Sequence, residues 1–133
     1  MGVVARRFSF ADSEVSAVGV DGDTLRVRFA AANVAEPDDT AFSGERQGHV
    51  TGVVLTCRGG PWPAGLDGYV GRLAEGRLSV RGEWLARLPL PVELTGTSRL
   101  ELRFANRTEL AVAVTAVSLT APHDAAFAES FAC

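Results

Sequence analysis

Strict alternation of apolar and polar residues is the feature that most limits the fold of this chain. It runs through three segments, 24–29, 77–81 and 99–104, with arginine or another polar residue at every second position. A period of two places one row of side chains on a buried face and the other in water, as in antiparallel sheets. No segment shows a helical period over more than a turn or two. The pattern therefore predicts an all-β protein.

Turn residues divide this pattern into strands about ten residues apart. The strongest turn signal is Asp21-Gly22-Asp23, because glycine adopts positive φ at little cost. With 133 residues, of which 47% are hydrophobic, the chain can bury one core without disulfides or metals. We expect one domain over 1–133, built as a single antiparallel β-sandwich or flattened barrel of about seven to nine strands.

Several segments depart from simple alternation. The buried phase shifts after Val114, which predicts a β-bulge at 115–116. Pro89 and Pro91 have no backbone N–H to donate to a neighbouring strand, so 88–91 should lie at a sheet edge or outside the sheet.

Three further segments are expected to differ from strands. The best helical candidate is 82–87, which carries Trp84 as an expected core residue. The segment 33–49 reads as a long irregular connection, and Phe127 and Phe131 favour docking of the C-terminal tail on the sandwich.

Residue usage excludes several kinds of chemistry. The chain has no lysine, and its only histidines are His49 and His123, so Schiff-base mechanisms and multi-histidine metal sites are ruled out. There is no Gly-x-Ser-x-Gly elbow. Cys57 and Cys133 are expected to be free thiols, with Cys57 an inert core residue. We expect no enzyme activity, no cofactor and no metal; the competing hypothesis is an enzyme that uses His49 with Cys57 or a loop carboxylate.

Charge is distributed unevenly. Residues 11–48 hold eight acids and three arginines, a net charge of −5, in a chain whose overall charge is −3. An acidic, mobile loop suits a basic protein partner through charge complementarity. The expected partner-binding residues are Glu36, Asp38, Asp39, Glu45 and Asp12.

Other partners are disfavoured. The pI of about 5.3 and the lack of a basic run argue against nucleic acid. No apolar run reaches the roughly 20 residues that span a bilayer, so we expect no membrane contact and a cytoplasmic location. Trp62 supports a second hypothesis, because it lies in the loop Gly59-Gly60-Pro61-Trp62-Pro63. If exposed there, it could stack on a sugar or another small ligand; the competing interpretation is a lid folded over the core.

Short motifs give the chain a resemblance to a group of small, uncharacterised bacterial all-β proteins. They are the opening Phe10-Ala11-Asp12-Ser13, the stretch Leu88-Pro89-Leu90-Pro91 and the closing Glu129-Ser130-Phe131, followed by Cys133. Those proteins often carry a histidine where this chain has Ala11. Any function that depends on that histidine is therefore not expected in this chain. Some similar small acidic proteins are immunity partners of bacterial toxins. The acidic segment 11–48, the long loop and the missing catalytic residues therefore favour a non-catalytic interaction protein. By analogy with those similar proteins, its specific form would be an immunity protein that binds a basic toxin domain.

Overall fold

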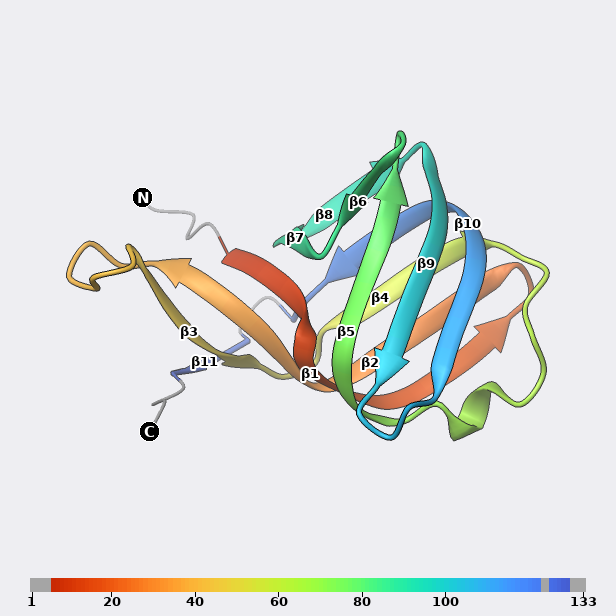
Figure 1. Cartoon of the computed structure of the whole chain (residues 1–133), viewed down its shortest axis with the longest axis horizontal. Helices are drawn as coiled ribbons and strands as arrows, with labels where there is room; N and C mark the ends of the chain where they lie inside the picture. Colours follow the sequence, from red (N-terminus) through yellow and green to blue (C-terminus); the bar gives the residue numbers. More distant parts are fainter. Residues whose placement is uncertain (1–5, 123–124, 130–133) are drawn as a thin grey trace.

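The computed structural model describes residues 6–122 and 125–129, which form eleven antiparallel strands and one 3₁₀ turn (Figure 1). The longer strands are β1 (Arg6–Asp21), β2 (Thr24–Pro37), β3 (Glu45–Val50), β4 (Val54–Gly59), β5 (Gly71–Val80), β9 (Thr97–Phe104) and β10 (Glu109–Thr120). The shorter elements are η1 (Leu66–Gly68), β6 (Glu83–Leu85), β7 (Arg87–Leu90), β8 (Val92–Thr95) and β11 (Phe127–Glu129). Among the described residues, no helix is long and apolar enough to cross a membrane.

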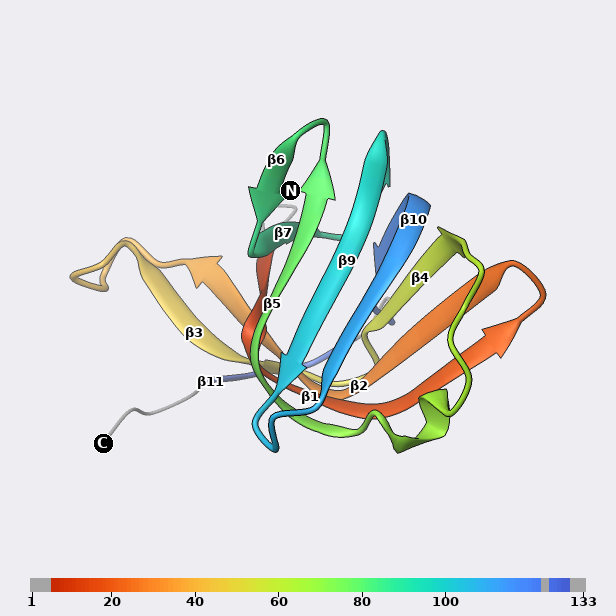
Figure 2. The same cartoon turned by 45° about the vertical axis from the view of Figure 1, so that its right-hand side comes forward.

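Six of the strands pair in a ring, in the order β1, β2, β4, β10, β9, β5 and back to β1. The last contact is short, because β1 pairs with β5 only at Glu14–Arg72 and Val15–Gly71. Figure 2 shows the curved sheet that results, with β5 and β9 facing β1 and β2 across the interior. The predicted all-β sandwich or flattened barrel is confirmed. The strand count exceeds seven to nine because β6, β7, β8 and β11 have three or four residues each.

A bulge in β10 divides this strand into two parts that pair with different neighbouring strands. Its register against β4 shifts between Val114 and Ala116, which confirms the predicted bulge. Before the shift β10 pairs with β9, and after it β10 pairs with both β4 and β8. The extra residue bends the strand at the point where the ring must turn.

A second bulge interrupts β1 and is built from the Phe-x-Asp-Ser motif. The register against β2 jumps between Ser9 and Glu14, and Asp12 has a φ of 67°. Ser13 is fully buried there; its Oγ donates to the carbonyl oxygen of Ser9 at 2.7 Å and accepts from the backbone N–H of Asn33 at 2.8 Å. The serine hydroxyl therefore takes the place of ladder hydrogen bonds that the bulge removes.

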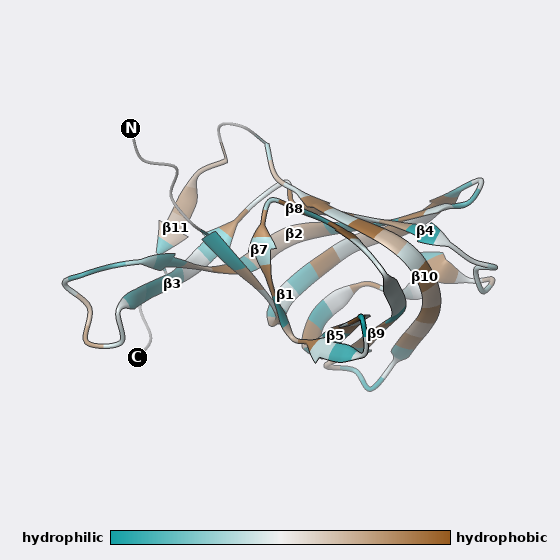
Figure 3. Cartoon of the chain, turned by 90° about the horizontal axis from the view of Figure 1, so that it is seen from above, coloured by the Kyte–Doolittle hydropathy of each residue, from teal (hydrophilic) through white to brown (hydrophobic). Residues whose placement is uncertain are grey.

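The core centres on aromatic residues from the first two strands. Phe8 packs edge-on against Phe10 and Phe29, with ring centres 5.0 and 5.2 Å apart. Gly76 on β5 lies against Phe10, and a Cβ at this glycine would come within 2.7 Å of the Cβ of Phe10. Figure 3 shows the resulting hydropathy pattern, with brown and teal residues alternating along the barrel strands and teal residues along β3.

The second half of β2 and all of β3 form an arm, residues 32–50, that projects from the barrel (Figure 1). The expectation of an irregular connection over 33–49 is wrong. Strand β2 continues to Pro37 and β3 begins at Glu45, so only the arm tip, residues 38–44, lies outside the strands. The arm is paired on both sides, since β1 flanks β2 and the short β11 flanks β3.

Two further expectations meet different outcomes. The segment 82–87 is not helical, because Arg81 and Gly82 have φ of 50° and 85° and make a two-residue turn between β5 and β6. Positive φ at both positions is the requirement of a type I′ hairpin. As a result Trp84 lies 43% exposed on β6 and is not a core residue. The proline segment behaves as predicted, because β7 is an edge strand that, within the described part of the chain, pairs with β1 alone.

Candidate functional site

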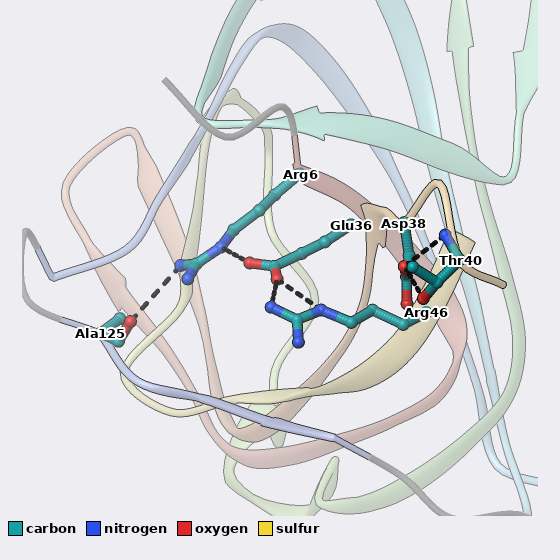
Figure 4. A network of polar contacts seen from close by, with 6 residues as sticks. All are labelled: Arg6, Glu36, Asp38, Thr40, Arg46 and Ala125. Atoms are coloured by element: carbon teal, nitrogen blue, oxygen red, sulfur yellow. Dashed lines mark hydrogen bonds and ion pairs between the residues drawn. The ribbon is translucent and has the colours of Figure 1, made fainter. Parts of the chain in front are cut away.

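A buried ion network holds the arm directly below its tip. Glu36 has a relative exposure of 3%, and its Oε2 accepts from Nε of Arg6 at 2.7 Å. Its Oε1 accepts from Nη2 of Arg46 at 2.7 Å and from Nε of the same residue at 3.2 Å. The three residues come from adjacent strands, β1, β2 and β3, and Figure 4 shows both guanidinium groups converging on the carboxylate. Glu36 therefore fixes the arm from inside and does not belong to a solvated acidic loop.

Glu36 is ionised despite its burial. Desolvation raises the pKa of its carboxyl, but the hydrogen bonds and positive charges of Arg6 and Arg46 outweigh desolvation and bring the pKa below the ordinary value of 4.5. A buried carboxylate with two charged donors is the arrangement that satisfies an ion away from water.

The same network reaches the C-terminal segment. Nη1 of Arg6 donates to the carbonyl oxygen of Ala125 at 3.4 Å, and the guanidinium of Arg46 lies 5.0 Å from the ring centre of Phe127. Gly48 makes room for this strand, since a Cβ there would lie 2.7 Å from the Phe127 ring. The prediction that the aromatic tail docks is confirmed for Phe127; Phe131 lies outside the described residues.

The arm tip is an ordered loop. Oδ1 of Asp38 accepts from the backbone N–H and the hydroxyl of Thr40, at 3.0 and 2.6 Å. The hydrogen bonds with Thr40 lower the pKa of Asp38 below its ordinary value of 3.8. The backbone N–H of Asp38 also donates to the carbonyl of Gly44 at 2.9 Å, which closes the loop. Asp38 is thus partly committed to the turn, while Asp39 is exposed beside it.

Phe42 is the most exposed large hydrophobic residue of the described chain, with a relative exposure of 110%. It lies at the arm tip, three positions from Asp39. Sequence reasoning missed it, because a single apolar residue inside a loop belongs to no periodic pattern. Folding gains nothing from a ring held entirely in water, so the apolar surface of Phe42 is available for burial against a partner.

Asp12 and Glu45 lie on the opposite face of the arm from Glu36. Asp12, in the β1 bulge, makes a long ion pair of 3.9 Å with Arg72 at the edge of a polar hollow of about 400 Å³. The hollow is lined by Asp12, Asn33, Gln47, His49 and Arg72. Glu45 begins β3 and pairs with Arg87 at 3.4 Å. The five predicted acids are therefore divided among a buried network, an ordered tip and a polar face.

Trp62 folds back over the core. It is half-buried and packs against the core residues, and its Nε1 is buried with no hydrogen-bond partner among the residues the structure describes. This packing agrees with the interpretation of Trp62 as a lid, with its Nε1 turned away from solvent.

His49 and Cys57, the residues of one form of the enzyme hypothesis, are far apart. Cys57 is fully buried in β4, and burial raises the pKa of its thiol to about 12. Cys57 pairs with Leu25 of β2, whereas His49 pairs with Asn33. These partners are eight positions apart, or about 26 Å of extended strand. His49 and Cys57 therefore do not form a dyad. His123 and Cys133 lie outside the described residues.

Comparison with known proteins adds no assignment. No family profile, no curated protein and no solved structure matches this chain. The geometry of its own residues is thus the basis of the functional argument.

Proposed function

We propose that this chain is a non-catalytic protein-interaction domain that binds its partner with the arm tip. The observation that carries this proposal is Phe42, whose side chain is wholly exposed at the end of a projecting hairpin. Burying an exposed phenylalanine in a partner's pocket contributes about 1.5–3 kcal/mol. Aromatic residues at the centre of an interface are frequent binding hot spots.

The arm tip is also suited to binding because it is already ordered. Hydrogen bonds within the loop fix Asp38 and Thr40, and a bond from the N–H of Gly44 to the carbonyl of Ala41 completes the turn. Below the tip, the Glu36 network holds the arm to β1 and to the C-terminal segment. A preorganised loop loses little conformational entropy on binding, so more of the contact energy is expressed as affinity.

The acidic residues of the arm tip indicate which kind of partner surface it would bind. Asp38 and Asp39 lie in the same loop as Phe42, so the surface that receives the tip should have an apolar pocket with a basic rim. An anionic membrane surface is disfavoured, because two carboxylates would approach negatively charged head groups. A toxin domain with a basic surface, neutralised by this chain as its immunity protein, is the specific partner class that we propose.

The test is comparative capture of partners by the full-length chain from the extract of its native cells. Bait variants are Phe42→Ser and Asp39→Arg, neither of which removes a hydrogen bond of the loop. The matched controls are Val20→Ser, at another exposed apolar residue, and Asp67→Arg, at an exposed acid in η1.

A partner bound through the tip should be recovered by the wild type and both controls and lost with both tip variants. The proposal is wrong if every protein recovered by the wild type is recovered equally by Phe42→Ser and Asp39→Arg.

A further inference from the structure

The outer face of β5, β9 and β10 carries charged side chains that alternate in sign across the strands. We call this set the charge ladder: Glu75, Arg77, Arg99, Glu101, Arg103 and Glu109. The register places Arg103 between the two outer glutamates and Glu101 beside Arg77. Three arginines and three glutamates give the ladder a net charge of zero.

The ladder is held by its own ion pairs. Glu101 is the central member, with Oε1 accepting from Nε of Arg77 at 2.9 Å and Oε2 accepting from Nε of Arg99 at 2.7 Å. These hydrogen bonds, first that of Arg99 and then that of Arg77, bring the pKa of Glu101 below its ordinary value. Glu75 and Arg103 form a further pair at 3.3 Å. The planar groups are thus oriented before any ligand arrives.

A hollow of about 380 Å³ lies among these side chains. Its lining includes the exposed residues Ala86 and Ala111, whose short side chains leave this space open. The volume falls within the range of small-molecule sites, about 300–1,000 Å³.

An exposed tryptophan lies next to this hollow. Trp84 on β6 is 43% exposed, and the guanidinium carbon of Arg77 lies 3.9 Å from its ring centre. Arg77 therefore connects the indole to Glu101 and to the hollow. Trp62, by contrast, is folded against the core, so Trp84 offers the more accessible indole.

We propose that this hollow binds a neutral saccharide. Each sugar hydroxyl both donates and accepts a hydrogen bond, and the ladder offers carboxylates that accept beside guanidinium groups that donate. The zero net charge gives no advantage to a polyanion or a polycation. The apolar face of a sugar ring can pack on the face of the Trp84 indole that Arg77 leaves uncovered. This site is separate from the arm tip, and it does not depend on the proposed protein partner.

The experiment uses the full-length chain with the substitution Trp62→Phe. Trp84 is then the single remaining tryptophan, so the indole fluorescence reports on it alone. It is titrated with neutral cello-, xylo-, manno-, malto- and chito-oligosaccharides while indole fluorescence is recorded, and isothermal titration calorimetry gives a second readout. At least one series should produce a saturable change. Glu101→Gln should then weaken binding by about tenfold or more, because a charged hydrogen-bond acceptor is lost. Glu93→Gln, an exposed glutamate on β8, should bind like the parent.

A further variant guards against effects on folding. Ala111→Tyr keeps every member of the ladder but fills the hollow, so it should abolish binding in a chain that folds normally. The proposal is overturned if no neutral oligosaccharide binds by either readout, if only sulfated or otherwise anionic glycans bind, or if Glu101→Gln and Ala111→Tyr leave the affinity unchanged.

Discussion

Nε of Arg6 donates to Oε2 of Glu36 at 2.7 Å. This hydrogen bond joins the first residue of β1 to a residue of β2 thirty positions later in the sequence. This contact, with the matching one from Arg46, ties the arm to β1 and to the C-terminal segment. The interaction surface at the arm tip is therefore supported by a buried ion network directly below it.

Replacing Glu36 with glutamine should destabilise the fold. The variant loses the carboxylate that neutralises two guanidinium groups, although both arginines retain some solvent, with side-chain exposures of 24% and 43%. We expect a loss of about 1–3 kcal/mol in the free energy of unfolding, below the full cost of breaking a deeply buried pair. Urea denaturation measures it. Glu45→Gln, which breaks an exposed pair with Arg87, should cost less than about 1 kcal/mol.

The same residue should make stability depend on acid pH. Because the pKa of Glu36 is lower in the folded protein than its ordinary value of 4.5, the unfolded chain takes up the proton first as the pH falls. The stabilisation is therefore complete above about 4.5 and is lost as the pH falls through the lower folded-state pKa. Urea midpoints recorded across this range should fall more steeply for the wild type than for Glu36→Gln. Parallel curves would show that Glu36 does not contribute to the acid transition.

Cys57 should be inert in the folded protein. Burial raises its pKa to about 12, so at pH 8 almost no thiolate is present. Alkylation by iodoacetamide, followed by mass spectrometry of the peptide containing Cys57, should show modification only after unfolding in denaturant. Modification in the native state at the rate of a free thiol would contradict the buried position.

Two strand glycines should respond differently to alanine. A Cβ at Gly76 would lie 2.7 and 2.9 Å from side-chain atoms of Phe10, so Gly76→Ala should cost about 1–3 kcal/mol through overpacking. Gly19, in β1, has no atom within 4 Å of the added Cβ, and Gly19→Ala should be neutral or slightly stabilising. Chemical denaturation of the pair is the check, and equal effects at both positions would contradict the packing around Phe10.

Local pattern was sufficient to predict much of this fold. Alternating residues identified the barrel strands, and the change of buried phase after Val114 located the bulge in β10. The prolines marked β7 as an edge strand. Each of these features depends on residues close together in the sequence.

The arm could not be predicted in the same way, because its structure depends on distant partners. Glu36 and Pro37 are poor strand residues, yet β2 continues through them because Arg6 and Arg46 neutralise the carboxylate from neighbouring strands. The prediction of Trp84 as a core residue is wrong because it treats 82–87 as a helix, whereas the hairpin turn at Arg81 and Gly82 places Trp84 on an exposed strand.

The most direct test of the account is the affinity of one identified partner for the wild type and for Phe42→Ser. Isothermal titration calorimetry with the purified partner should show at least a tenfold loss of affinity for Phe42→Ser, because about 1.5–3 kcal/mol of apolar burial is removed. Val20→Ser should bind like the wild type. Equal affinities of the wild type and Phe42→Ser would show that the arm tip is not the interaction surface.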